Sequence, residues 1–181
     1  MFVRKTMSLE EAIKKEIRDI PDFPKPGIIF KDITPLFYDQ KLCTEIVDEF
    51  IERLEEMPDA IIGIESRGFL FGFLVANKIN VPFVLVRKVG KLPYKTVKEE
   101  YALEYGTSII EMHEDALQKG WKVIIHDDLL ATGGTAEAAA RLVEKMGAKV
   151  AGFNFVIGLD FLNGKSKLVN HTNNITCLVH Y

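Results

Sequence analysis

The chain has 181 residues, of which 48% are hydrophobic and 27% charged, and these proportions argue against a disordered protein. Its formal net charge of −3 argues against a nucleic-acid coat protein or an anionic-membrane binder, so an anionic ligand would need a local cluster of donors. The length fits one domain with one substantial core, and no apolar run is long enough to span a membrane.

The first third of the chain combines two helical patterns with a proline-rich stretch between them. Ser8 and Glu11 form a capping box, which predicts a helix that runs to about Asp19. Residues 21–27 include three prolines and a glycine, so they can be neither helix nor central strand. From about Lys41, apolar residues at helical spacing predict a second helix with a stripe of Leu42, Ile46, Phe50, Ile51 and Leu54.

The rest of the chain alternates short apolar strands with helices. Helices are expected over residues 69–79 and 135–146, and residues 87–102 form a polar segment with glycine and proline breaks. The expected strands cover residues 60–64, 82–86, 107–112, 122–125 and 150–157. This pattern indicates an α/β fold, with a central, mostly parallel sheet flanked by helices. Such sheets bind ligands beyond the carboxyl ends of their strands, so motifs that follow strands carry most of the functional information.

The most informative motif, at residues 127–135, reads Asp-Asp-Leu-Leu-Ala-Thr-Gly-Gly-Thr. Asp127 and Asp128 follow a strand, where they can face solvent, and the two glycines precede a helix. Glycines let main-chain N–H groups converge on an anion, and the helix N-terminus adds free donors and a favourable dipole. No lysine follows Gly134, which excludes a Walker A loop, and the glycine spacing excludes a dinucleotide fingerprint. The motif predicts a phosphate cradle beside acids that bind a ribose diol; a solvated corner with surface acids is the alternative.

This motif resembles the phosphoribosyl pyrophosphate (PRPP) binding motif of type I phosphoribosyltransferases, almost letter for letter in its adenine-specific form. The resemblance implies that Asp127 and Asp128 bind the ribose hydroxyls of PRPP. It also implies a 5′-phosphate site made by Ala131, Thr132, Gly133, Gly134 and Thr135. His126 departs from the pattern, in which an apolar residue is usual, and we expect it to pack or hydrogen-bond rather than to catalyse.

Two further segments place basic side chains after strands. Arg67, in the segment 61–69, offers a planar fork of donors, although a solvent-facing arginine at a helix start is a common alternative. Arg87 and Lys88 follow the next strand, where the alternative is a solvated basic loop. The first segment resembles the family's pyrophosphate loop, in which the peptide before Ser66 is often cis, and the second resembles the start of its mobile catalytic loop. The implied pyrophosphate contacts are Glu65, Ser66, Arg67, Arg87, Lys88 and Lys91, with Arg67 also implied as catalytic.

The basic loop ends in Tyr-Ala-Leu-Glu-Tyr-Gly at residues 101–106, an acid flanked by aromatics beside a glycine hinge. Such a segment could close over a substrate and exclude water, or it could be an edge strand with alternating aromatics. The resemblance implies that Glu104 is a catalytic carboxylate near the base nitrogens and that Tyr105 shields the site. Tyr94 stands where many relatives carry glycine or a charged residue, and its role is left open.

A stiff, extended segment at residues 23–35 precedes the second helix. By itself the sequence favours Phe30 as an ordinary core residue, although a purine needs a flat apolar surface with donors and acceptors along its edge. The segment resembles the hood of the adenine-specific enzymes, contributed mainly by about residues 1–38 of a single domain that covers residues 1–181. The resemblance implies adenine contacts from Ile29, Phe30, Lys31 and, on the other face of the base, Leu159.

Four motifs in the family's order, between about residues 23 and 164, imply a pentosyltransferase of purine salvage. It would transfer the 5-phosphoribosyl group from PRPP to adenine and release AMP and pyrophosphate. The expected cofactor is Mg²⁺, held mainly by PRPP and water. One alternative is the same reaction with hypoxanthine, xanthine or orotate, against which the segment 23–35 argues. Another is a non-catalytic PRPP sensor, for which no DNA-binding domain is visible.

The remaining expectations concern partners and surroundings. Family members are typically homodimers, and a homodimer without nucleic-acid or membrane partners is expected. Cys43 and Cys177 form no disulfide framework and lack neighbouring metal ligands, so we expect two buried structural thiols in a protein of the reducing cytoplasm.

Overall fold

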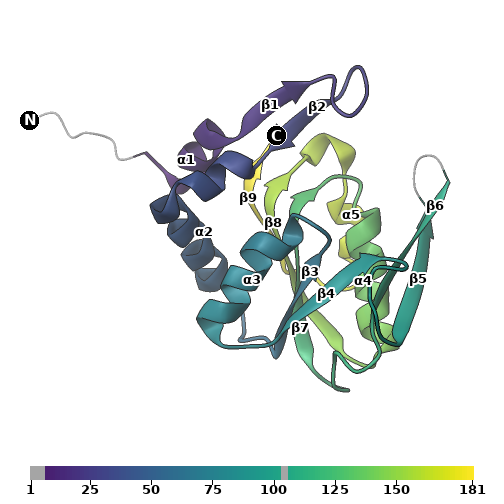
Figure 1. Cartoon of the computed structure of the whole chain (residues 1–181). Helices are drawn as coiled ribbons and strands as arrows, with labels where there is room; N and C mark the ends of the chain where they lie inside the picture. Colours follow the sequence, from purple (N-terminus) through teal and green to yellow (C-terminus); the bar gives the residue numbers. More distant parts are fainter. Residues whose placement is uncertain (1–6, 103–105) are drawn as a thin grey trace, which may run out of the picture. The chain divides into compact units, whose positions relative to one another are not determined.

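A computed structural model of the chain describes residues 7–102 and 106–181, which divide into two compact units, Met1–Glu49 and Phe50–Tyr181 (Figure 1). In the first unit, α1 (Leu9–Glu16) begins at the predicted capping box. The Ser8 hydroxyl accepts the N–H of Glu11 at 3.2 Å, and the Glu11 carboxylate accepts the N–H of Ser8 at 2.8 Å. These reciprocal bonds satisfy two donors that the first helical turn would otherwise leave unpaired.

The predicted end of this helix at about Asp19 is wrong. Helix α1 ends at Glu16, because β1 (Arg18–Pro21) pairs in antiparallel fashion with β2 (Ile29–Asp32). The proline-rich stretch makes the connection between these strands and includes a cis Phe23–Pro24 peptide. The 3₁₀ helix η1 (Thr34–Tyr38) follows, and α2 (Gln40–Glu52) begins one residue before the predicted start.

The second unit is built on a seven-stranded sheet, in the order β5-β6-β4-β3-β7-β8-β9. Its strands are β3 (Ala60–Ile64), β4 (Phe83–Lys88), β5 (Thr96–Ala102), β6 (Thr107–His113), β7 (Lys122–Leu130), β8 (Lys149–Gly158) and β9 (Ile175–His180). Strands β4, β3, β7, β8 and β9 are parallel to their neighbours in that series, whereas β6 is antiparallel to both β4 and β5. The predicted central, mostly parallel sheet is therefore confirmed.

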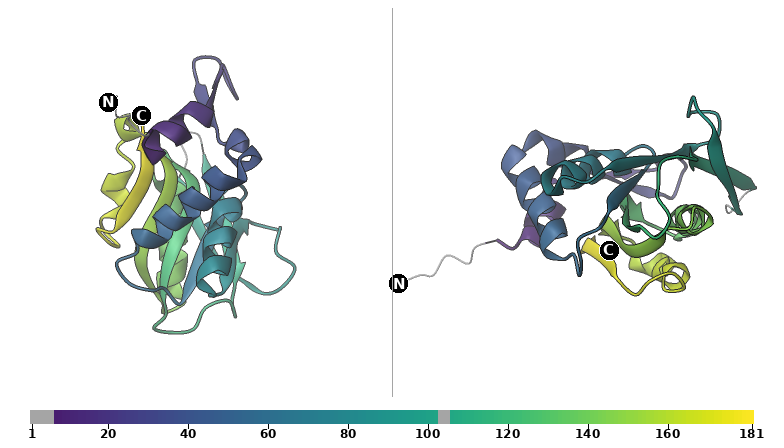
Figure 2. Two further views of the ribbon diagram at one scale, coloured as in Figure 1. Left: turned by 90° about the vertical axis from the view of Figure 1, so that its left-hand side faces the viewer. Right: turned by 90° about the horizontal axis from the view of Figure 1, so that it is seen from below.

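Helices α3 (Gly68–Ile79) and α4 (Gly134–Lys145) lie on opposite faces of this sheet (Figures 1 and 2). The core under α4 includes Leu142 and Val143 of the helix with Val123 and Ile125 of β7, all fully buried. Because side chains alternate along a strand, Ile124 and His126 of β7 face the other side of the sheet, where α3 lies. Two short elements, η2 (Asp160–Leu162) and α5 (Lys165–Leu168), connect β8 to β9.

The polar segment 87–102 contains a strand that the sequence did not predict. In β5, Glu99 and Tyr101 are buried while the residues between and beside them are exposed, which is the alternation of a half-buried strand. The alternating pattern was not recognised in the sequence because a charged residue, Glu99, occupies one of the inward-facing positions. The Glu99 carboxylate accepts a hydrogen bond from Arg141 of α4 at 2.7 Å and another from Lys145, so its charge is paired. Burial would raise the pKa of Glu99, but these bonds outweigh it and lower the pKa.

Two other strands differ from prediction. Strand β7 continues to Leu130 instead of ending at Ile125, because its pairing with β8 runs on to Gly158. Strand β9 (Ile175–His180) was not predicted, and it extends the parallel sheet beyond β8.

His126 is a packing residue on the α3 face of β7. Its ring is 1% exposed and meets the ring of Phe50 edge-on, with centroids 5.1 Å apart. Neither ring nitrogen has a hydrogen-bond partner among the residues that the structure describes. Burial lowers the pKa of His126 to about 3, so this histidine stays neutral at physiological pH. The expectation that it packs is confirmed, and the alternative of a hydrogen bond is not.

We predict that His126→Leu reduces the loss of stability in mild acid. Below about pH 6.5 the unfolded chain protonates this histidine, whereas the folded chain does so only near its pKa of about 3, so folding is disfavoured as pH falls. Between pH 7 and pH 5 the original protein should lose about 2 kcal/mol more free energy of unfolding than the variant. Urea unfolding at both pH values measures the difference, and parallel losses in the two proteins would contradict the prediction.

Candidate active site

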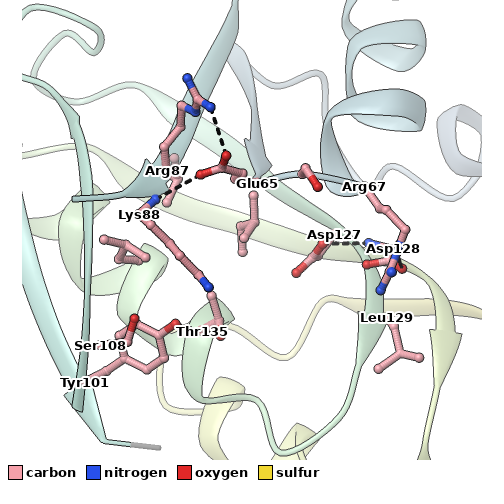
Figure 3. A pocket seen from close by; sticks show the side chains of 14 residues that line it. Glu65, Arg67, Arg87, Lys88, Tyr101, Ser108, Asp127, Asp128, Leu129 and Thr135 are labelled. Carbon is pink, nitrogen blue, oxygen red and sulfur yellow. Dashed lines mark hydrogen bonds and ion pairs between the residues drawn. The ribbon is translucent and has the colours of Figure 1, made fainter. Parts of the chain in front are cut away.

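A cavity of about 430 Å³ lies at the carboxyl ends of β3, β4 and β7 (Figure 3). It opens there because the pairing of β3 with β7 stops at Gly63 and His126, after which β3 turns away into the segment before α3. Its lining includes most of the polar residues that the sequence singled out, together with apolar side chains from the strand ends. The residues are Ile64, Glu65, Ser66, Arg67, Val86, Arg87, Lys88, Tyr101, Ser108, Ile110, Asp127, Asp128, Leu129 and Thr135.

An ion pair joins the turn after β3 to the acid pair on β7. The Glu65–Ser66 peptide in this turn is cis, as the resemblance implied. Arg67 follows, and its Nε donates to the Asp128 carboxylate. The next residue must be small, because a Cβ on Gly68 would lie 2.9 Å from the Asp127 Cα and 2.8 Å from the His126 carbonyl oxygen. Gly68 therefore lets α3 begin directly against β7.

The two acids differ in their surroundings. Asp128 is only 5% exposed, so the expectation that both carboxylates face solvent is wrong for this residue. Continued pairing of β7 with β8 and the contact with Arg67 account for its burial. Burial of Asp127 beside the charge of Asp128 raises the pKa of Asp127 well above its ordinary value. Asp127 thus tends to hold a proton, and the neighbouring Asp128 is paired with Arg67.

Glu65 positions two cations, Arg87, which lines the cavity, and Lys91, which is not among its lining residues. Its carboxylate accepts hydrogen bonds from Arg87 Nη2 at 2.8 Å and from Lys91 Nζ at 2.7 Å. Burial would raise the pKa of Glu65, but these bonds outweigh it and lower the pKa to about 2. In the part of the chain that the structure describes, the buried Nε of Arg87 has no partner, so this guanidinium retains a donor. The Glu65 carboxylate therefore holds two cations, and the pyrophosphate contact implied for Glu65 remains a prediction.

Glu111 is a buried acid that the sequence reasoning missed. Its carboxylate accepts the main-chain N–H groups of Gly90, Lys91 and Leu92 at 2.9, 3.2 and 3.2 Å, and the Thr96 hydroxyl at 3.0 Å. Burial would raise the pKa of Glu111, but these bonds together lower it. Glu111 therefore fixes the path of the chain after β4, the strand that ends in Arg87 and Lys88. A charged residue inside the apolar run Ile-Ile-Glu-Met was the available signal.

The predicted phosphate turn lies between β7 and α4. Gly133 adopts φ +77°, a left-handed conformation, and a Cβ there would come within 2.5 Å of the Gly164 carbonyl oxygen. Of the five residues implied for the 5′-phosphate, Ala131 to Gly133 form the turn itself, Gly134 begins α4, and Thr135 lines the cavity. The N–H groups of the first turn of α4 point out of the helix at this end, as an anion site requires.

The residues implied for adenine lie in different parts of the structure. Leu159 lines a second cavity, of about 250 Å³, with Leu130, Asp160, Asn163, Gly164 and Lys165. Ile29, Phe30 and Lys31 belong to β2 of the first unit, where the Phe30 ring meets that of Phe23 edge-on at 5.1 Å. The Lys31 ammonium pairs with Asp19 at 2.6 Å. The adenine contacts remain a prediction, and Glu104 and Tyr105 lie outside the described residues.

Neither a protein-held metal site nor a membrane span appears among the described residues. They contain no group of three or more His, Cys, Asp or Glu side chains arranged to hold a metal ion. None of their helices is long and apolar enough to cross a membrane. Cys43 and Cys177 are both buried free thiols, and burial raises the pKa of each.

Comparison with known proteins identifies the relatives of this chain. Residues 37–176 match the family model of the phosphoribosyl transferase domain. The chain is 54% identical to the adenine phosphoribosyltransferase of Cytophaga hutchinsonii over 174 residues, which cover 96% of each protein. The crystal structure of adenine phosphoribosyltransferase from Thermoanaerobacter pseudethanolicus is 48% identical, with a TM-score of 0.91 over 96% of this chain and 100% of that one. The enzyme of Saccharomyces cerevisiae, complexed with an imino-altritol bisphosphate and adenine, is 42% identical, with a TM-score of 0.88 over 94% and 98% of the two chains.

We predict that Gly133→Ala weakens the binding of ribose 5-phosphate about tenfold or more. The added Cβ meets the Gly164 carbonyl oxygen, so the turn must shift out of its anion-binding shape. Gly120→Ala is the matched control, because Gly120 has φ +86° but no atom within 4 Å of an added Cβ. Both variants should lose about 1 kcal/mol of stability from backbone strain, and Gly133→Ala should lose more because of the contact with Gly164. Calorimetric titration measures the affinities, and equal affinities in the two variants would contradict the prediction.

Proposed function

Because this chain belongs to the adenine phosphoribosyltransferases of the type I phosphoribosyltransferase family, we propose that it transfers the 5-phosphoribosyl group of PRPP to adenine in purine salvage. The products are AMP and pyrophosphate. One observation carries the proposal: a single cavity at the carboxyl ends of three parallel strands joins the acid pair, the Arg67 turn and the start of α4. This is the arrangement needed for a ligand with a diol between two phosphorylated ends.

The ribose 5-phosphate half of PRPP occupies the side of the cavity near β7 and α4. The 5′-phosphate accepts hydrogen bonds from the turn Ala131 to Thr135 and from the free N–H groups of α4. Asp128 accepts a hydrogen bond from one ribose hydroxyl. Asp127, whose raised pKa favours a bound proton, can donate to the other. The acid pair therefore offers one acceptor and one donor to a diol.

The pyrophosphate half lies near the cations of the neighbouring strand ends. Arg67, Arg87, Lys88 and Lys91 supply its donors, and Glu65 keeps two of them in place. Mg²⁺ accompanies PRPP as part of the substrate, and when bound it neutralises phosphate charge through oxygen ligands and water. The lining of the cavity fits that role, because Asp127 and Asp128 are assigned to the ribose hydroxyls and the oxygens of PRPP and water would supply most of the ligands of the ion. In this arrangement Arg67 and Asp128 contact different halves of PRPP, so binding separates the ion pair between them.

The chemistry then depends on orientation and charge. As the bond from C1′ to pyrophosphate breaks, the ribose gains oxocarbenium character, which nearby carboxylates stabilise. A nitrogen of adenine attacks the opposite face, and positioning of the two reactants supplies much of the rate. Glu104 accepts the proton that adenine loses, and Tyr105 excludes water from the site. These last two roles rest on the family resemblance.

The base site is assigned to the first unit and the end of β8. Residues 1–181 act as one domain, in which about residues 1–38 form a hood. The resemblance assigns contacts with the two faces of adenine to Phe30 and Leu159, and contacts with its edge to the main chain of Ile29 and Lys31. In support, the antiparallel pairing with β1 holds β2 as an extended strand.

The enzyme is further proposed to be a cytoplasmic homodimer. One face of α3 exposes Leu70, Phe73 and Leu74 by 46%, 53% and 40%, at helical spacing. Burying such a patch against a second copy would be favourable. Sedimentation velocity gives the mass in solution, and a monomer at micromolar concentration would refute this assignment.

The proposed reaction is tested by incubating the protein with PRPP and Mg²⁺ and with one base at a time. Adenine should be converted to AMP, with hypoxanthine, xanthine and orotate at least about a hundredfold poorer substrates, because a site built for one set of hydrogen bonds rejects bases that leave its groups unpaired. Turnover of another base in preference to adenine would reassign the substrate. Binding of PRPP without turnover of any base would indicate a sensor instead of an enzyme.

We predict that Asp128→Asn lowers kcat/KM for PRPP by roughly tenfold to a hundredfold, because a charge-assisted hydrogen bond contributes about 1.5–3 kcal/mol. Asp115→Asn makes the same chemical change at an exposed position and should leave kcat/KM unchanged. Steady-state kinetics at saturating adenine measures both variants. Unimpaired efficiency in Asp128→Asn would remove this residue from the ribose site.

A further inference from the structure

Two hydroxyl groups that the sequence did not single out lie in the cavity opposite the acid pair. Tyr101 and Ser108 occupy paired positions on the antiparallel strands β5 and β6, and both line the cavity. Tyr101 is 8% exposed, and its hydroxyl lies 3.3 Å from Oγ1 of Thr135, the first residue after the glycines of the phosphate turn (Figure 3). A side chain of β5 therefore contacts the proposed 5′-phosphate site directly.

The hydrogen bond between Tyr101 and Thr135 leaves one proton unused. Each hydroxyl carries one proton, and their mutual bond uses only one of the two, whichever group donates. Within the described residues, no other hydrogen bond is formed by the Tyr101 hydroxyl or by the Thr135 side chain. A buried tyrosine hydroxyl usually has a partner for its own proton, so the pair is short of one acceptor.

The charge around this pair favours an anion as that acceptor. Figure 3 shows the Lys88 side chain extending toward Thr135 from β4, and the positive end of the α4 dipole lies at the same place. The carboxylates that line the cavity belong to Glu65, Asp127 and Asp128, and these are occupied by cations or by each other.

The position of Tyr101 relative to α4 is fixed by packing and by ion pairs. Its Cδ2 atom would lie 3.8 Å from a Cβ on Gly134, so the ring rests on the first turn of the helix. Two residues earlier on β5, Glu99 is held by Arg141 and Lys145 of the same helix. The hydroxyl is thus presented to the phosphate turn by a preorganised strand.

We propose that Tyr101 is a phosphate-binding residue, whose hydroxyl, together with that of Thr135, donates to the 5′-phosphomonoester of the phosphoribosyl substrate. The assignment rests on the proposed function, because it takes the turn before α4 as the 5′-phosphate site. It adds a donor from β5, so a bound phosphate contacts both α4 and that strand.

The test compares Tyr101→Phe with the original protein in the binding of ribose 5-phosphate and of adenine, by calorimetric titration. The substitution keeps the ring and removes only the hydroxyl. Ribose 5-phosphate should bind about tenfold or more weakly, since the lost bond is to a charged group, and adenine should bind as before. Thr44→Val, which removes a hydroxyl that donates to the Gln40 carbonyl within α2, should bind both ligands normally.

Unchanged affinity of Tyr101→Phe for ribose 5-phosphate would overturn the proposal. So would an equal weakening of ribose 5-phosphate and adenine, because a general structural defect does not select the phosphate. Turnover of adenine and PRPP by the original protein is measured in parallel. Its absence would refute the proposed reaction, while the ribose 5-phosphate comparison would still decide the role of Tyr101.

Discussion

The ion pair between Arg67 and Asp128 organises the site, because it joins two segments that the chain keeps 61 residues apart. Arg67 begins α3 after the cis peptide, and Asp128 lies on the part of β7 that has passed the end of β3. With one carboxylate buried and paired, the other is left half-buried beside a negative charge, and this raises the pKa of Asp127. A change at Arg67 would therefore alter both acids as well as the pyrophosphate side.

Carboxylates also position the remaining cations of the site. A polyanionic substrate needs several cations in one cavity, and cations that are close together repel one another unless carboxylates are placed between them. Glu65 binds the side chains of Arg87 and Lys91. Glu111 binds the main-chain N–H groups of residues 90–92, which precede β5. The acids of this region thus preorganise the cations, and a chain with a net charge of −3 can still present a basic site.

Patterns that are local in the sequence predicted much of the fold and of the site. The Asp-Asp pair was expected just after a buried strand and lies on the last part of that strand, and the register of β3, β4 and β7 brings it beside the Arg67 turn. Features that depend on tertiary pairing could not be read in this way. Strand β5 was hidden because its inward Glu99 is neutralised from α4, and Glu111 and Tyr101 acquire their roles only when β5, β6 and α4 meet. The burial of Asp128 likewise depends on an arginine supplied by a distant turn.

The most direct test of this account is a crystal structure of the protein with PRPP and Mg²⁺ bound. The account predicts the 5′-phosphate on Thr135 and the first N–H groups of α4, a ribose hydroxyl on Asp128, and an Arg67 side chain that has moved away from that carboxylate. A phosphate bound elsewhere, with the pair between Arg67 and Asp128 intact, would contradict it.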